Sequence, residues 1–225
     1  MTKEVFPRTG RDDRRGEHLA DEFGAWHKRR YNAFTLIELV LVVGIITVLA
    51  GLVLSTVGYA RKKGARARAE TEIAAMSAAC ENYKADNGIY PRGPATSMTV
   101  GSGTIPANVT DNLNAQTNGD PTSSITPTYG QTSLYLYTQL SGDLVGNQQA
   151  TAKSYFAFKP QMLSTDSNGY VTAIKDPFGN SYAYSTANQA NPAQGYNPTF
   201  DLWTTCTLTN SSPSAADQNQ WIKNW

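Results

Sequence analysis

The feature that most constrains this chain is an uncharged run from Leu39 to Ala60, made mostly of Leu, Val, Ile, Ala and Gly. A helix needs roughly 20 apolar residues to cross the hydrocarbon core of a bilayer. A buried core helix is the alternative, but so long a run with no polar face is typical of a membrane span. A cleaved secretory signal would be shorter and would end at a small-residue cleavage site. We therefore predict one membrane-spanning helix.

The residues after this run predict that the same helix continues as an amphipathic segment, 61–91. Four residues share one helical face, at positions i, i+3, i+7 and i+10: Ile73, Met76, Cys80 and Tyr83. No proline interrupts the helix, and Gly64 is its weakest point. Asn87-Gly88 provides the stop, and Pro91 follows. We expect a helix that is apolar in its first half and packed along one stripe in its second.

Residues 92–225 predict a globular head. The segment 92–130 is rich in Gly, Pro, Thr, Ser and Asn, and we expect a long, irregular and variable loop. Ser133–Leu140 is apolar enough for a short helix that ends at Ser141-Gly142. At the C-terminal end, we expect at least one of Trp221 and Trp225 to dock on the core, because an exposed pair would be unusual.

Three short segments of the head predict strands. Tyr170–Lys175 and Ser181–Ser185 flank Asp176–Asn180, whose proline and glycine suit a type I turn, so we expect an antiparallel hairpin. Phe200–Cys206 is the third strand candidate. The predicted fold class is α+β, with a long N-terminal helix packed against a small antiparallel sheet.

Charge and histidine content exclude several functions. The net charge is only +1, and the one basic cluster is Arg61, Lys62, Lys63, Arg66 and Arg68, so we expect no nucleic acid partner. Residues 1–33 are charged and non-periodic, as in a processing segment. They hold both histidines, His18 and His27. If they are removed, Ser-His and Cys-His catalysis is excluded, and the chain also lacks a GxSxG elbow and a P-loop. We expect no enzyme.

The two cysteines, Cys80 and Cys206, leave two interpretations open. They form no CxxC pair, so a structural zinc site is not expected. Outside the cytoplasm they could form one disulfide. Alternatively, both are unpaired and buried as small hydrophobic residues.

A single carboxylate, Glu38, stands at the start of the apolar segment. A charge inside a membrane span costs roughly 2.5–3.5 kcal/mol at the helix centre and less near its end, so such residues usually have a partner. A cut between Ala33 and Phe34 would create an α-amino group with an ordinary pKa of about 7.7–8. Glu38 lies within the first two turns and could compensate that amine in its own chain or in a neighbour.

The stretch Ala33–Val43 (AFTLIELVLVV) resembles the processing and methylation site of type IV prepilins and type II secretion pseudopilins. The resemblance implies that a prepilin peptidase removes the leader 1–33 by cleaving before Phe34 and methylates the new amine. It also implies that Glu38 pairs with the amine of an adjacent subunit during assembly. Two features depart from the family pattern: Ala33 stands where glycine is usual, and the leader is long.

Four further segments resemble the major pseudopilin group of type II secretion: Asn82–Pro91, Asp176–Tyr184 and the two closing segments Phe200–Trp203 and Trp221–Trp225. In that group the closing segment often holds calcium, which would implicate Asp201 and Asp217 here. The usual Gly- and Asp-rich stretch is replaced by Thr204–Asn210, however, and calcium needs several oxygen ligands. We therefore expect no cofactor, with calcium at these two aspartates as the alternative.

The topology prediction depends on the same resemblance. The side of a membrane helix with more Lys and Arg residues usually faces the cytoplasm. Close to the apolar run, the basic cluster gives the head side more of them, but the eight Lys/Arg residues of 1–33 give the leader side more when the whole segment is counted. The resemblance places the leader in the cytoplasm and the head outside the bacterial inner membrane, in the periplasm or beyond. The partners it implies are the peptidase, membrane lipid, further copies in a helical filament, minor pseudopilins and the inner-membrane assembly platform.

We therefore favour a structural function, as a filament subunit with a core segment 34–60 and a head. The filament would be a type II secretion pseudopilus, which acts in protein export, or a related pilus-like filament. Two alternatives remain: a minor pilin of an adhesion or competence filament, and a single-pass anchored ectodomain that binds a partner without any filament. Substitution of Glu38 by alanine separates the last from the others, because a simple anchor would tolerate it.

Overall fold

The computed structural model describes residues 34–123 and 127–225. They fall into two units, one ending at Leu52 and one comprising Val53–Trp225. The elements, in chain order, are α1 (Leu36–Asn87), β1 (Met98–Val100), β2 (Gly103–Ile105), α2 (Val109–Asn112), α3 (Tyr129–Ser141), the 3₁₀ helix η1 (Pro160–Met162), β3 (Leu163–Thr165), β4 (Val171–Ile174), β5 (Ala183–Ser185), α4 (Ala187–Ala190), β6 (Asp201–Thr204), α5 (Ala215–Gln218) and β7 (Ile222–Lys223). The α+β fold class is confirmed.

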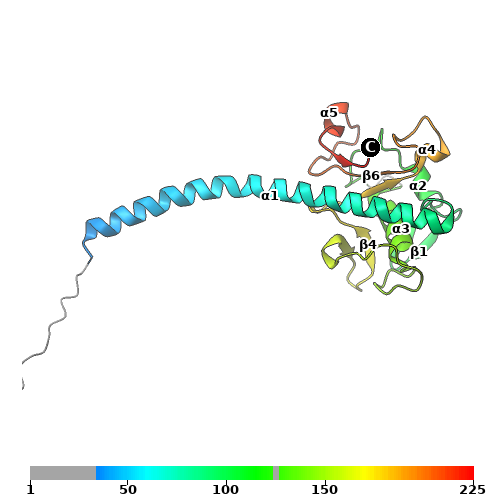
Figure 1. The fold of residues 1–225 in the computed structure, drawn as a ribbon, viewed down its shortest axis with the longest axis horizontal. Coiled ribbons are helices and arrows are strands. Elements are labelled where there is room, and N and C mark those ends of the chain that lie inside the picture. Colours follow the sequence, from blue (N-terminus) through cyan, green and yellow to red (C-terminus); the bar gives the residue numbers. More distant parts are fainter. Residues whose placement is uncertain (1–33, 124–126) are drawn as a thin grey trace, which may run out of the picture. The chain divides into compact units, whose positions relative to one another are not determined.

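Helix α1 belongs to both units and runs unbroken through Gly64, as predicted (Figure 1). It ends where the sequence indicated. Gly88 adopts the left-handed conformation at φ +78°, and its N–H donates to the Lys84 carbonyl at 2.8 Å. This geometry satisfies an orphan carbonyl in the last turn and prevents the helix from continuing.

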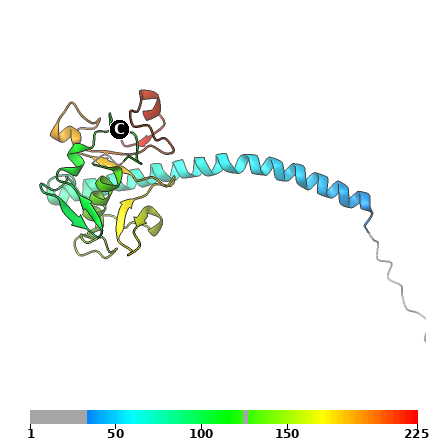
Figure 2. The ribbon, with the colours of Figure 1, turned by 180° about the vertical axis from the view of Figure 1, so that it is seen from behind.

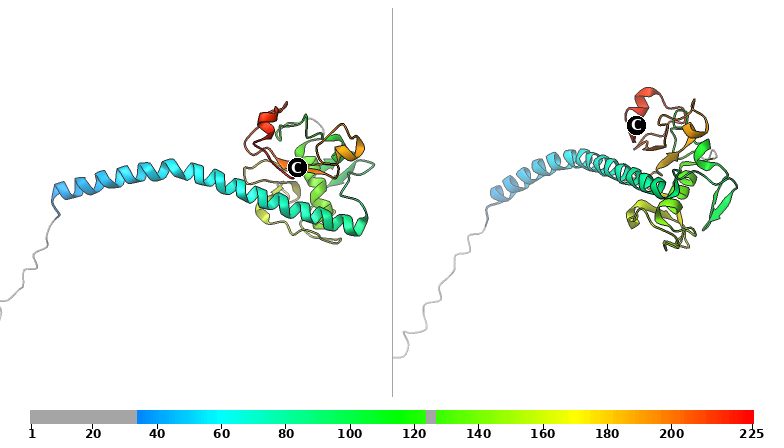
Figure 3. Two further views of the ribbon diagram at one scale, coloured as in Figure 1. Left: turned by 45° about the horizontal axis from the view of Figure 1, so that its top comes forward. Right: turned by 45° about the vertical axis from the view of Figure 1, so that its right-hand side comes forward.

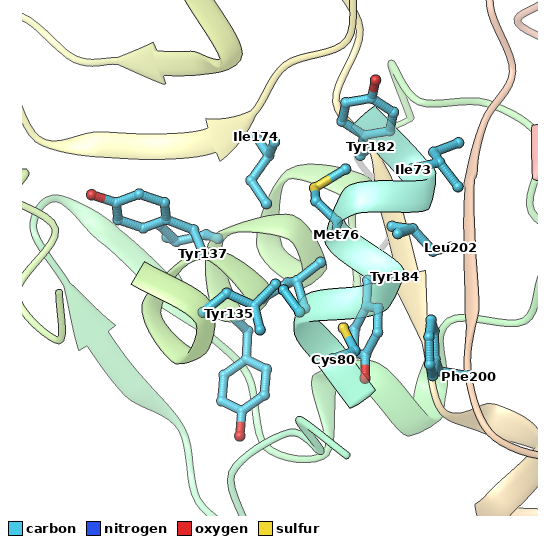
Figure 4. Close-up of a cluster of buried hydrophobic side chains, with 14 of the residues drawn as sticks. Ile73, Met76, Cys80, Tyr135, Tyr137, Ile174, Tyr182, Tyr184, Phe200 and Leu202 are labelled. Carbon is cyan, nitrogen blue, oxygen red and sulfur yellow. The ribbon is translucent and has the colours of Figure 1, made fainter. Parts of the chain in front are cut away.

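The head is built on the second half of α1. Ile73, Met76 and Cys80 are buried in one hydrophobic cluster, so the predicted apolar face is confirmed. Figure 4 shows the side chain of Cys80 beside that of Tyr184 within this cluster. Helix α3 packs against β4 and β5, and Figures 2 and 3 show the strands of the head gathered around α3 and this half of α1.

The strands form three small antiparallel sheets, where we expected one. β1 pairs with β2, β3 with β4, and β6 lies between β5 and β7. The C-terminal residues take part in the last sheet, and Trp221 is buried beside Trp203, as predicted for at least one terminal tryptophan. No strand exceeds four residues in the described part of the chain, so side chains between the sheets and the helices supply most of the core.

The hairpin predicted around Asp176–Asn180 forms only at its turn. Lys175 and Ser181 make one antiparallel bridge, and the Tyr182 N–H donates to the Ile174 carbonyl at 2.9 Å. Beyond that point the strands separate, since β4 pairs with β3 and β5 pairs with β6. The predicted strand Phe200–Cys206 is confirmed as β6, the central strand of its sheet.

Segment 92–130 is only in part the irregular loop that we expected. It holds the β1–β2 hairpin and the short helix α2. Val100, Ile105 and Val109 are buried in the core cluster and anchor these elements to the head. The hairpin turns at Gly101 (φ +54°), where a Cβ atom would lie 2.6 Å from the Cβ of Tyr170. The glycine-rich composition therefore marks a tight turn against the core rather than a loose loop.

Candidate functional site at the start of α1

The start of α1 is closed by a reciprocal pair of side chains, Thr35 and Glu38. Glu38 Oε2 accepts the Thr35 N–H at 2.9 Å and the Thr35 hydroxyl at 2.7 Å, while the Glu38 N–H donates to Thr35 Oγ1 at 3.3 Å. This is a capping box, which satisfies free N–H groups of the first turn. The positive end of the helix dipole also favours the carboxylate there.

The sequence interpretation missed this role of Thr35, although the pattern Thr-x-x-Glu before an apolar run predicts it. The capping box has a consequence for Glu38. The carboxylate is held by its own chain with one oxygen, Oε2, as the acceptor of both bonds from Thr35. Its other oxygen, Oε1, accepts no hydrogen bond in the described structure and is free to meet a donor from outside this chain.

Around Glu38, the first half of α1 exposes apolar side chains on every side. The exposed large ones from Phe34 to Leu54 are Phe34, Leu36, Ile37, Leu39, Val40, Leu41, Val42, Val43, Ile45, Ile46, Val48, Leu49, Leu52, Val53 and Leu54. Among the described residues, α1 is the one helix long and apolar enough to span a membrane. Glu38 is the sole charged residue from Phe34 to Ala60.

Of the two residues that flank the proposed cleavage site, the structure describes only Phe34. Phe34 is 82% exposed and precedes the capping box by one residue. Ala33, the leader 1–33 and its two histidines lie outside the described residues. Cleavage before Phe34 and methylation of its amine therefore stay predictions.

At the other end of the apolar segment lies the basic cluster. Arg66 pairs with Glu70 at 3.3 Å, and Arg68 pairs with Glu72 at 2.7 Å, each one helical turn further along. Arg61, Lys62 and Lys63 are exposed and form no ion pair within the described residues. Three cations thus stand unpaired directly after the apolar run.

Both cysteines are free and buried. Cys80 lies in the core on α1, and Cys206 lies beside Arg66, with 4.0 Å between its sulfur and Nη1. Burial raises the pKa of the Cys206 thiol to about 11, even though the Arg66 charge lowers it. The structure thus has the second of the two arrangements that the sequence left open, with the thiols packed as small hydrophobic groups.

The two aspartates considered for calcium have local structural roles. Asp201 is buried, and its two carboxylate oxygens accept the backbone N–H groups of Tyr196 and Asn197 at 2.9 and 2.8 Å. Asp217 forms a capping box with Ser214 at the start of α5. Within residues 34–123 and 127–225, no three His, Cys, Asp or Glu side chains form a metal-binding group. These residues do not fit a calcium site.

The start of α1 also matches a known protein family in sequence. Residues 28–54 match the family described as "Prokaryotic N-terminal methylation motif". The N-terminal segment therefore carries an N-terminal methylation motif. The matched residues include the capping box of Thr35 and Glu38 and most of the exposed apolar half of α1.

Relatives that match part of this chain are named "Type II secretion system core protein G". The protein from Aeromonas hydrophila is 38% identical over 64 residues, which are 28% of this chain and 45% of that protein. The one from Vibrio cholerae is 36% identical over 63 residues, which are 28% and 43% of the two chains. The chain thus spans less than half the length of these relatives. No solved structure matches.

Proposed function

We propose that this chain is a structural subunit of a type II secretion pseudopilus or a closely related filament, made as a prepilin and anchored in the inner membrane. The observation that carries the proposal is Glu38, a lone carboxylate at the start of an exposed apolar helix, within a matched prepilin methylation motif. The function of the subunit is to assemble into the filament, and we assign the chain no catalytic step.

The proposed sequence of events follows from charge and hydrophobicity. The prepilin peptidase cleaves between Ala33 and Phe34 and methylates the Phe34 amine. The apolar half of α1 holds the subunit in the bilayer and then packs against other copies in the filament core, so that it stays out of water throughout. The Phe34 amine of one subunit meets the Glu38 carboxylate of another, which offsets the cost of keeping both charges in an apolar surrounding.

The capping box supports this proposal in a specific way. Because Thr35 uses one carboxylate oxygen of Glu38, the side chain is already oriented before a partner arrives. A charged group that is held in place loses little side-chain entropy when it pairs. We therefore propose Thr35 as a residue that positions Glu38, with Glu38 making the contact between subunits.

The processing step is tested by intact mass and N-terminal sequence of the chain from membranes with and without a prepilin peptidase. We expect a chain that begins at methylated Phe34 only when the peptidase is present. A chain that keeps its leader under both conditions contradicts the proposal.

The assembly step is tested by filament yield for Glu38→Ala beside Glu70→Ala, a control that removes an exposed carboxylate of the same helix outside its apolar half. We expect Glu38→Ala to abolish filaments and Glu70→Ala to preserve them. Thr35→Val removes the cap but keeps the Glu38 carboxylate, so we expect it to lower filament yield less than Glu38→Ala does. If it abolishes assembly as fully as Glu38→Ala does, Glu38 acts through the helix cap, and the proposed pairing between subunits is wrong.

A further inference from the structure

A groove of about 340 Å³ opens on the head beside α1. Lys62 and Arg66 line it from α1, Phe178 and Leu208 contribute apolar surface, and Asn219 and Gln220 line it from the segment after α5. All of these residues belong to the unit Val53–Trp225. None of these residues takes part in the proposed processing or assembly.

The groove is positively charged. Its lining contains two cations and no carboxylate. Arg66 is fixed, because its guanidinium donates to the Gln220 carbonyl at 2.8 Å and to the Trp221 carbonyl at 3.4 Å, and its Nε pairs with Glu70. Its Nη1 also contacts the Cys206 sulfur at 4.0 Å. A guanidinium has five N–H donors, so one remains. Lys62 is exposed and makes no hydrogen bond or ion pair within the described residues, so its ammonium is available for an anion.

The groove also lies at a defined height along α1. Lys62 and Arg66 follow Ala60, the last residue of the apolar run, by two and six positions. At about 1.5 Å per residue, they stand about 3 and 9 Å beyond the end of that run. The polar headgroup layer on each side of a bilayer is about 5–8 Å thick. Lys62 therefore falls at the depth of this layer, and Arg66 falls at its outer edge. Tyr59, 73% exposed, stands at the boundary, where aromatic residues are enriched.

We propose that this groove binds the phosphate of a membrane phospholipid from the leaflet on the head side. Lys62 and the remaining N–H group of Arg66 contact the phosphate oxygens, and Phe178 and Leu208 contact the glycerol and upper acyl carbons. The inference rests on the membrane anchorage in the proposed function and deepens it. One bound headgroup sets the height and rotation of the head above the membrane before the subunit enters a filament.

Lys63 provides a matched control for Lys62. The two lysines are adjacent, exposed and equally charged, but about 100° apart around the helix, and only Lys62 lines the groove. General attraction of a basic segment to an anionic membrane would involve both lysines equally. A bound headgroup would depend on Lys62 alone.

The experiment is native mass spectrometry of the full chain, extracted in mild detergent from membranes that contain phosphatidylglycerol. We expect the wild type to retain one phospholipid and Lys63→Gln to match it. Lys62→Gln should lower the retained fraction about fivefold, the loss expected for one basic residue at a membrane surface. Equal losses for the two variants, or no retained lipid in the wild type, would overturn the proposal.

A second pair of variants tests the groove from its other side. Thr207 and Thr209 are both exposed, and only Thr207 lines the groove. Thr207→Glu should lower lipid retention by repelling the phosphate, whereas Thr209→Glu should leave it unchanged. Tryptophan fluorescence confirms that each variant is folded. If Thr207→Glu retains lipid as the wild type does, the phosphate is not in this groove.

Two other ligands define outcomes against the proposal. If the molecule retained by the wild type has the mass of inorganic phosphate and not of a phospholipid, the groove takes free phosphate and not a lipid. If Lys62→Gln blocks filament assembly without changing lipid retention, the groove takes a carboxylate of a neighbouring subunit. The measurement needs neither peptidase nor filament. A chain that assembles without lipid therefore refutes this inference alone, and a chain that binds lipid but never assembles refutes the proposed function alone.

Discussion

The two halves of α1 are both rich in apolar residues, but the chain covers only one of them. In the first half, Leu49 is 56% exposed, and its neighbours are exposed on all sides. In the second half, Met76 is fully buried, and apolar residues form a single stripe among alanines and charges. One small head can bury a stripe, but a helix that is apolar all round must be covered from every direction. The described chain leaves the first half uncovered, as the proposed membrane anchor and filament core would require.

The two halves also differ in how they hold their carboxylates. Glu38 is held by Thr35, three residues away, so its geometry is a property of one helical turn. Glu72 accepts the hydroxyl of Tyr182 at 2.7 Å, across 110 residues, as well as the Arg68 guanidinium. Local capping leaves Glu38 accessible to a partner, whereas the tertiary bond fixes Glu72 inside the head.

The largest effect is expected from truncating the buried stripe. Met76→Ala removes a fully buried side chain and should lower the free energy of unfolding of the head by about 2–5 kcal/mol. Leu49→Ala, in the exposed half, should change it by less than about 0.5 kcal/mol. Denaturant titration of the full chain in detergent, followed by tryptophan fluorescence, measures both. Equal losses would mean that the exposed half is part of the folded head.

A smaller effect is expected from the hydroxyl that reaches Glu72. Tyr182→Phe leaves a buried carboxylate with one bond fewer and should cost about 1.5–3 kcal/mol, the range for hydrogen bonds to charged groups. Tyr59→Phe removes an exposed hydroxyl at the end of the apolar half and serves as the matched control. The same denaturant titration applies. If Tyr182→Phe loses no more free energy of unfolding than Tyr59→Phe does, Glu72 finds another donor when the hydroxyl is absent.

Helix caps in the two units should differ in what they stabilise. Thr128 and Gln131 form a capping box at the start of α3, in the head. Thr128→Ala should lower the stability of the head by about 1 kcal/mol. Thr35→Ala removes the equivalent hydroxyl from α1, and the unfolding midpoint of the head should stay unchanged. A shift of that midpoint by Thr35→Ala would show that the two units unfold together.

The smallest effect is a pH dependence confined to the head. Burial raises the pKa of Asp176 above its ordinary value of 3.8, against the opposing hydrogen bonds from Thr204 and the turn. From pH 3.8 up to the raised pKa, the folded state binds more protons than the unfolded state, so this group's contribution to stability falls as pH rises. Asp176→Asn should remove that dependence. Denaturant midpoints measured across this pH range test the sign, and a wild type that gains stability relative to Asp176→Asn as pH rises would contradict it.

Much of this protein could be predicted from short-range pattern. The unbroken helix, its stop at Gly88, the stripe that includes Met76 and the strand β6 all follow from residues that lie within a few positions of one another. The N-terminal methylation motif, which includes Phe34 and Glu38, is likewise a continuous stretch. Helical periodicity, turn chemistry and linear motifs are local properties, which a sequence displays directly.

The partners of each strand were decided by the tertiary structure. Ala183 pairs with Trp203 because both lie in one core cluster around Tyr129 and Trp221, and this contact draws β5 away from the expected hairpin with β4. The groove beside Lys62 likewise joins α1 to residues more than 100 positions later. Short strands carry too little pattern to specify a partner, so their pairing depends on which distant side chains the core brings together.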